Sequence, residues 1–100
     1  PQPDTFRPIL ETEYVAAQNE FEEIIQDIWV EVMEIDKIGI HDNFLEIGGD
    51  SLAGIRIVSR LSQAFEIDFP VNLIFQKSTI AQLAVHIEET IVKLMEEMED

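Results

Sequence analysis

The residues with the clearest capacity for chemistry lie between Glu46 and Leu52, where the sequence reads Glu-Ile-Gly-Gly-Asp-Ser-Leu. The two glycines let the backbone bend sharply, and Asp50 and Ser51 are both residue types preferred at helix N-caps. An amphipathic run begins at Leu52, so the pattern predicts a helix start with the Ser51 hydroxyl facing solvent. The N–H groups and dipole of a helix start favour a phosphate ester there. The motif alone leaves two readings open, a covalent attachment site and an N-cap only.

Other reactive groups are scarce. The chain has no cysteine, which excludes disulfides, a thiol nucleophile and thiolate metal sites. Its two histidines, His41 and His86, have no cysteine near them, and the acidic residues do not follow a calcium-loop spacing, so we expect no metal site. The segment Gly49-Asp50-Ser51-Leu52 also spells the motif of the GDSL esterases. Those enzymes need a strand before the serine, and none is predicted here, which disfavours this alternative.

Length and charge limit the class of protein. One hundred residues build a single domain with one core. The formal net charge of −15, from 21 acidic and 6 basic residues, argues against binding to nucleic acid or anionic membranes. No apolar run reaches the roughly 18 residues of a membrane span, and the first residues do not form a signal-peptide pattern. We therefore expect a monomeric, cytoplasmic domain taken from a larger protein, with proteins as its partners.

Hydrophobic spacing predicts helices and no strand. The first helix follows the N-cap Asn19, with Glu22 as its capping-box partner. Its expected apolar stripe is Phe21, Ile24, Ile25, Ile28, Trp29 and Val32. The second helix is expected from about Ser51 to Phe65. Its expected buried side is Gly54, Ile55, Val58, Leu61 and Phe65. Because glycine inside a helix costs about 1 kcal/mol relative to alanine, Gly54 predicts the close approach of a neighbouring element.

A long loop, a short third helix and a fourth helix complete the chain. The loop from Ile35 to Gly49 is too apolar to be free, and we expect Phe44 to anchor it across the helices. The other apolar residues expected to pin it are Ile38, Ile40, Leu45 and Ile47. Pro70 is expected to start helix three, which covers 71–75. Helix four follows the caps Ser78 and Thr79, with the stripe Ile80, Leu83, Ala84, Ile87, Ile91 and Leu94. The predicted fold is an all-α, small four-helix bundle of three long helices and a short helix three.

A small basic ridge is predicted on the outer face of the second helix. Arg56 and Arg60 lie four residues apart, one turn from Ser51, in a chain with few basic residues. The ridge is either ordinary surface charge or, together with Leu52 and Ala53, part of a docking face. Both readings stay open at this point.

Three segments in order resemble the carrier (thiolation) domains of non-ribosomal peptide synthetases, an acyl-carrier-protein-like family. They are Asp42 to Leu52, Phe69 to Phe75 and Thr79 to Leu83. In that family the serine matching Ser51 is esterified with 4′-phosphopantetheine, which a phosphopantetheinyl transferase takes from coenzyme A. The thiol of this arm carries aminoacyl or peptidyl groups as thioesters. The resemblance implies a non-catalytic domain with Ser51 as the covalent site, flanked by Gly49, Asp50 and Leu52.

The resemblance also implies partners and domain bounds. It implies docking faces around Leu52, Ala53, Arg56 and Val71. The implied partners are the transferase and adenylation, condensation, epimerisation, thioesterase or polyketide synthase domains, in the same chain or another. Residues 1–18 would be a linker from an upstream synthase domain, 19–90 the carrier domain, and 91–100 a C-terminal helix extension or linker.

Two further alternatives differ in how much of the sequence they explain. An acyl carrier of a polyketide or fatty-acid system suits the acidity of the chain, whereas Arg56 and Arg60 favour the peptidyl type because fatty-acid carriers tend to present an acidic face there. A purely structural helical interaction module explains the hydrophobic periodicity but not the three motifs together.

Overall fold

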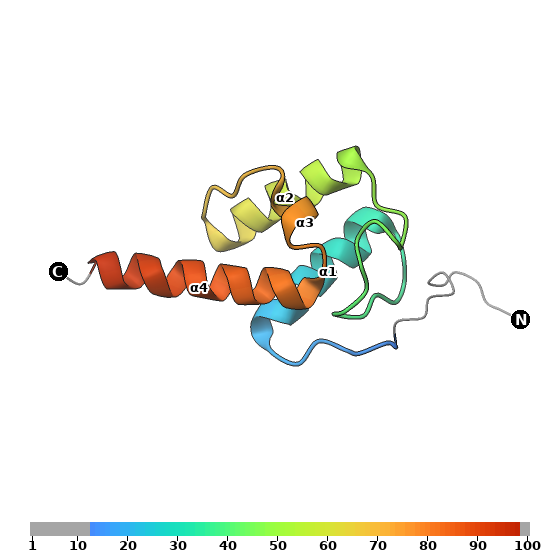
Figure 1. The fold of residues 1–100 in the computed structure, drawn as a ribbon, viewed down its shortest axis with the longest axis horizontal. Helices are drawn as coiled ribbons and strands as arrows, with labels where there is room; N and C mark the ends of the chain where they lie inside the picture. The colour runs from blue at the N-terminus through green and yellow to red at the C-terminus, as the bar shows by residue number, and fades with distance from the viewer. Residues whose placement is uncertain (1–12, 99–100) are drawn as a thin grey trace, which may run out of the picture.

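The computed structural model describes residues 13–98, which form four helices and no strand. In chain order these are α1 (Glu20–Met33), α2 (Ser51–Phe65), α3 (Leu73–Gln76) and α4 (Ile80–Met98). Helix α1 contacts both α2 and α4, and α3 contacts α2 (Figure 1). The predicted fold, three long helices and a short third one, is confirmed. None of the helices in the described range is long and apolar enough to cross a membrane.

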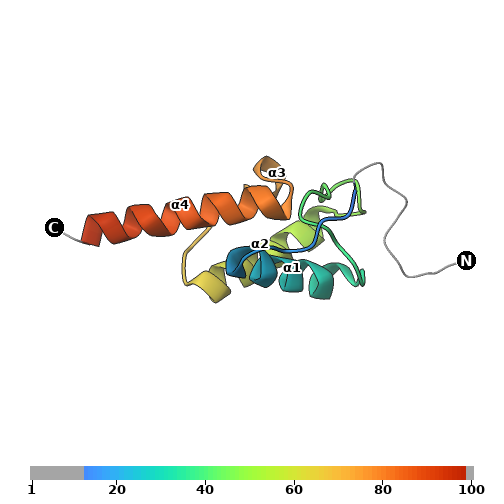
Figure 2. The ribbon, with the colours of Figure 1, turned by 90° about the horizontal axis from the view of Figure 1, so that it is seen from below.

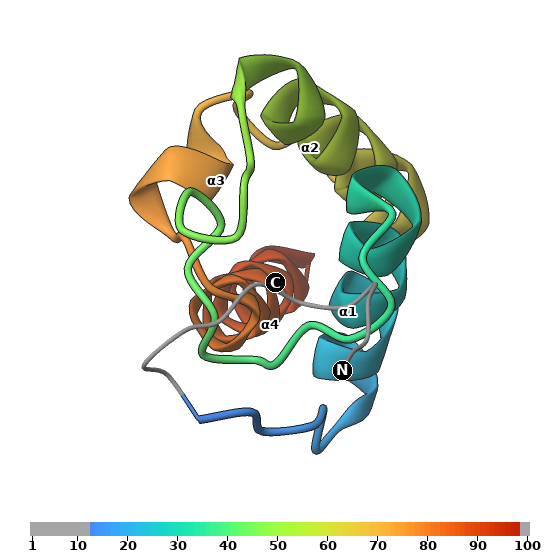
Figure 3. The same cartoon turned by 90° about the vertical axis from the view of Figure 1, so that its right-hand side faces the viewer.

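The loop between α1 and α2 runs along the bundle and sends its apolar side chains into the core. Figure 3 shows this loop in green, passing from the end of α1 to the side of α3 before it returns to α2. Phe44 is fully buried, with its ring edge-on to Trp29 at 5.7 Å and to Phe75 at 5.9 Å between centroids. Such aromatic contacts add to the large apolar area that the ring removes from water. Phe44 is therefore the anchor of the loop, as predicted.

The buried faces of the helices are narrower than their apolar stripes. Ile24 is 39% exposed and Ile55 is 48% exposed, although both were expected in the core. At 100° per residue, each lies roughly 110° from the centre of its helix's buried face. Ile57, which the projection left out, is fully buried instead. In the loop, Leu45 is 55% exposed and does not pin it, whereas the other predicted apolar residues of the loop are buried.

Side chains cap the starts of the three long helices. Asn19 Oδ1 accepts a hydrogen bond from Glu22 N at 2.9 Å, which confirms the predicted N-cap of α1. Thr79 Oγ1 likewise accepts from Gln82 N at 3.1 Å at the start of α4. The expected start of helix three at Pro70 is wrong: Pro70 opens a turn, and α3 begins at Leu73.

Gly54 brings α2 close to α3. A Cβ atom at this position would lie 3.0 Å from the Phe75 ring and 3.1 Å from the Ile74 side chain. These distances are shorter than ordinary van der Waals contact. The absence of a side chain at Gly54 therefore lets α2 and α3 pack this closely. The close approach predicted for Gly54 is confirmed.

The two ends of the described chain differ in how they relate to the bundle. Residues 13–18 form no helix, but the carbonyl oxygen of Val15 accepts a hydrogen bond from Ile40 N at 2.9 Å. Helix α4 continues without a break past residue 90 and projects beyond the other helices (Figure 2). The proposed linker at 1–18 and extension at 91–100 remain predictions, and residues 1–12 and 99–100 of them lie outside the described range.

Candidate functional site

Asp50, not Ser51, caps the start of α2. The backbone of Asp50 is extended, and its Oδ1 accepts a hydrogen bond from Ala53 N at 2.9 Å. Ser51 is the first helical residue, and it is exposed. Within residues 13–98, its hydroxyl has no hydrogen-bond partner. The alternative in which Ser51 serves as the N-cap is therefore wrong, and its hydroxyl is free for other chemistry.

The two glycines before Asp50 are needed for different reasons. Gly48 has φ +100°, a backbone conformation that residues with side chains rarely adopt. Gly49 has no such torsion, but a Cβ atom there would collide with the ring of Phe44. The chain therefore turns at Gly48 and passes directly against the buried anchor of the loop at Gly49. This route fixes the position of Asp50, and through it the start of α2.

A side chain in the loop reinforces the turn that precedes the glycines. Asn43 Oδ1 accepts hydrogen bonds from Leu45 N at 2.9 Å and from Glu46 N at 3.3 Å. Gly49 N donates to the carbonyl oxygen of Phe44 at 2.9 Å, which closes the turn. The segment before Ser51 is thus held by its own hydrogen bonds and by a core aromatic ring. Ser51 lies at the end of an ordered connection.

The charge around α2 differs from that of the rest of the chain. Between its first and last residues, α2 carries Arg56 and Arg60 and no acidic residue, in a protein of net charge −15. Arg60 forms a salt bridge with Glu31 of α1. Arg56 has no ion-pair partner within the described residues. The predicted ridge therefore divides into one arginine that joins two helices and one that is free beside the start of α2.

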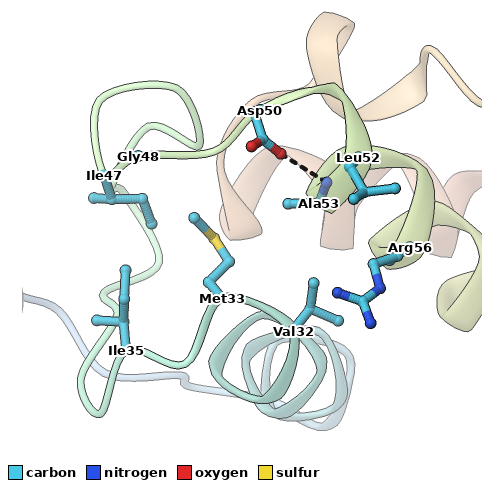
Figure 4. A pocket seen from close by; sticks show the side chains of 9 residues that line it. All are labelled: Val32, Met33, Ile35, Ile47, Gly48, Asp50, Leu52, Ala53 and Arg56. Carbon is cyan, nitrogen blue, oxygen red and sulfur yellow. Dashed lines mark hydrogen bonds between the residues drawn. The ribbon is translucent and has the colours of Figure 1, made fainter.

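A groove of about 240 Å³ lies between the end of α1, the loop and the first turns of α2 (Figure 4). Its apolar part comes from Val32, Met33, Ile35, Ile47, Leu52 and Ala53. Figure 4 shows Val32 and Met33 extending from α1 toward α2. The charged groups of the lining are Asp50 and Arg56. The groove thus contains the residues on both sides of Ser51 in the sequence.

The residues expected to dock partners do not form one uniform patch. Leu52, Ala53 and Arg56 come together at the groove, where Ala53 is half-buried and the other two are exposed. Val71 is 61% exposed but lies in the turn before α3 and does not line the groove. Sequence reasoning missed Ile55 as a surface residue. The sequence did contain a signal for this. Because α2 has more apolar residues than one buried face can hold, the burial of Ile57 leaves Ile55 at the surface.

A helical bundle with an exposed serine at the start of its second helix has the architecture of a carrier protein. A peptidyl carrier protein solved with the phosphopantetheine transferase Sfp and coenzyme A has a TM-score of 0.72 and 32% identity, covering 76% of this chain and 99% of that one. A docking-domain complex of the Pax peptide synthetase, PaxA T1-CDD/PaxB NDD, has a TM-score of 0.75 and 35% identity, covering 97% and 88%. The class of the fold is therefore that of the peptidyl carriers.

The family model described as the phosphopantetheine attachment site matches residues 23–87, and the chain belongs to this family. Tyrocidine synthase 3 of Brevibacillus parabrevis is 46% identical over 77 residues, which are 77% of this chain and 1% of that protein. The chain spans only 1% to 2% of the first curated relatives it matches. It is a non-catalytic peptidyl carrier domain for covalent 4′-phosphopantetheine, as predicted.

Proposed function

We propose that this chain is the carrier domain of one module in a modular non-ribosomal peptide synthetase, with Ser51 as the attachment residue. One observation carries the choice of Ser51: it is an exposed serine at a helix start whose hydroxyl is not used in capping. The glycines and Asp50 support the site by fixing where α2 begins. The covalent 4′-phosphopantetheine supplies a thiol that holds an aminoacyl or peptidyl group as a thioester.

The residues around Ser51 fit a phosphate ester. The N–H groups of Ala53 and Gly54 already donate to Asp50, at 2.9 Å each. The N–H groups of Ser51 and Leu52 have no acceptor within the described residues, so they are available to an anion at the positive end of the helix dipole. Arg56 adds an unpaired positive charge on the same helix. These groups would hold the phosphate of the arm close to the protein.

Docking of partner enzymes is proposed for the exposed residues near this site. Leu52, Ala53 and Arg56 surround the groove, and Val71 offers an apolar side chain near α3. The proposed partners are a phosphopantetheinyl transferase, as in the Sfp complex, and the adenylation, condensation, epimerisation, thioesterase or polyketide synthase domains of the same system. Arg60 contributes less to docking because Glu31 already pairs with it. We propose a cytoplasmic location, with residues 19–90 as the carrier domain.

Intact mass after incubation with coenzyme A, Mg²⁺ and a broad-specificity transferase tests this function. The parent chain should gain one phosphopantetheine, and Ser51→Ala should gain none. Ser59→Ala is the matched control, because Ser59 is also an exposed serine on α2, and it should load like the parent. If Ser51→Ala gained a phosphopantetheine, the attachment residue would be one other than Ser51. No loading of the folded apo parent, by a transferase that loads a known carrier, would overturn the proposal.

A further inference from the structure

We propose that residues 14–17, which precede α1 and which we call the strap, are a positioning segment for Ser51. They hold the middle of the loop between α1 and α2, and this loop in turn fixes the start of α2. The inference rests on the proposed attachment at Ser51. It extends the working unit of the carrier beyond the proposed bounds of 19–90, because the strap would contribute to how the serine is presented for loading.

The strap lies directly on the loop, backbone against backbone (Figure 2). A Cβ atom on Gly39 would lie 3.0 Å from Val15 N and 3.3 Å from the Val15 carbonyl oxygen, so a side chain at this position would displace the strap. Val15 and Ala17 are half-buried and pack against the core. The Lys37 ammonium lies 4.3 Å from the centroid of the Tyr14 ring. The strap is therefore in contact with the loop along its length.

Ile40 joins the strap to α4. Its N–H donates to the Val15 carbonyl oxygen at 2.9 Å, and its own carbonyl oxygen accepts from Ala81 N, also at 2.9 Å. Ile40 is only 3% exposed, so its N–H is shielded from water while the strap is in place. A buried donor that loses its acceptor is costly, because the group has already given up its hydrogen bonds to water. Release of the strap would therefore open the loop at Ile40.

The loop can carry this change to the start of α2 over a short path. Gly39 N donates to the buried carboxylate of Asp42 at 2.8 Å, two residues before the anchor Phe44. Gly49 N donates to the Phe44 carbonyl oxygen at 2.9 Å, and a Cβ atom on Gly49 would collide with the Phe44 ring. Asp50, which caps α2, follows directly. Hydrogen bonds, one ring contact and the covalent chain thus connect the strap to the cap.

The strap is held weakly enough to be released without unfolding the domain. A backbone hydrogen bond and a cation–π contact each shift the equilibrium between a bound and a released strap by roughly two- to tenfold. None of the fully packed core residues within the described range belongs to the strap. We therefore expect release of the strap to lower the rate of loading while the four helices stay in place.

Hydrogen exchange and loading kinetics on the same variants test the proposal. Gly39→Val puts a side chain against the strap. Exchange of the Ile40 and Gly49 N–H groups should rise, at Ile40 by about tenfold or more, and kcat/KM for loading by the transferase should fall by about threefold or more. Ala84→Gly is the matched control, because it removes a buried methyl group from α4 and lowers stability without touching the strap. It should load at the rate of the parent.

The outcomes separate this inference from the proposed function. If the parent gains no phosphopantetheine, the proposed function fails, and the hold of the strap on the start of α2 is then judged from exchange at Gly49. Loading of Gly39→Val at the parent rate, despite faster exchange at Ile40, overturns the positioning role. An equal fall in Ala84→Gly also overturns it, because the effect would then be one of stability.

A second variant covers the case in which Gly39→Val does not fold. Lys37→Met removes the cation–π contact at an exposed side chain and leaves the backbone of the loop unchanged. It should raise exchange at Ile40 by about two- to fivefold and lower kcat/KM for loading in the same direction. Exchange at Ile40 that stays at the parent value in Lys37→Met would overturn the strap.

Discussion

Alanine substitutions at Asp50 and Ser51 should separate stability from loading at two adjacent residues. Asp50 provides the cap of α2 through the hydrogen bond from Ala53 N, at 2.9 Å. Loss of such a cap costs about 1 kcal/mol, within a range of roughly 0.5 to 2. In a domain of this size, that loss lowers the melting temperature by about 4 to 8 °C. Ser51 is exposed and its hydroxyl makes no hydrogen bond within the described residues, so Ser51→Ala should change stability by less than about 0.5 kcal/mol.

Urea unfolding followed by circular dichroism would measure both changes, with loading measured by intact mass on the same samples. Asp50→Asn is the control, because asparagine caps helices about as well as aspartate. Asp50→Ala should be less stable yet still load, whereas Ser51→Ala should be stable and should not load. Equal stability of Asp50→Ala and the parent would refute the assignment of the cap. A loss of stability in Ser51→Ala as large as in Asp50→Ala would refute the claim that the hydroxyl is free.

Other predictions concern packing around the site and along α4. Gly49→Ala should destabilise the fold by about 1 to 3 kcal/mol, because the added methyl overlaps the Phe44 ring, and an unchanged urea midpoint would show that the loop can move aside. Ile87→Ala should cost about 2 to 5 kcal/mol because it leaves a cavity in the core. Leu94→Ala, at a side chain 42% exposed beyond the bundle, should change stability by less than about 0.5 kcal/mol in the same assay. Similar losses at both positions would contradict the exposed extension of α4.

Local signals were sufficient to predict the framework. Asn19 and Thr79 are capping residues followed by apolar stripes, and the structure places both caps as expected. The second helix was predicted from about Ser51 to Phe65, and α2 has these bounds in the structure. Phe44 was predicted as the anchor because a large apolar residue in a long loop needs a core to enter. These features depend on residues close in sequence.

Features that depend on distant residues were not predictable in the same way. Periodicity placed Ile24 and Ile55 on the buried faces of their helices, but both are exposed. The width of a buried face depends on which helices pack on it. The difference between Arg56 and Arg60 depends on Glu31 of another helix. The groove combines three separate parts of the chain, so no single motif indicates it. Asp50 and Ser51 are both good capping types, and only the backbone conformation decided between them.

The hydrogen bond from Ile40 N to the Val15 carbonyl oxygen holds the segment before α1 against the loop between α1 and α2. A Cβ atom on Gly39 would lie 3.0 Å from Val15 N, so this glycine lets the N-terminal segment lie directly against the loop. A tether to a preceding domain would then be fixed at Val15 and not at the start of α1. The free length of such a tether would be shorter by the four residues between Val15 and α1, which is roughly 13 Å of extended chain. The loop that holds Val15 also leads to Ser51. The attachment of a preceding domain at Val15 would therefore have a fixed position relative to the serine.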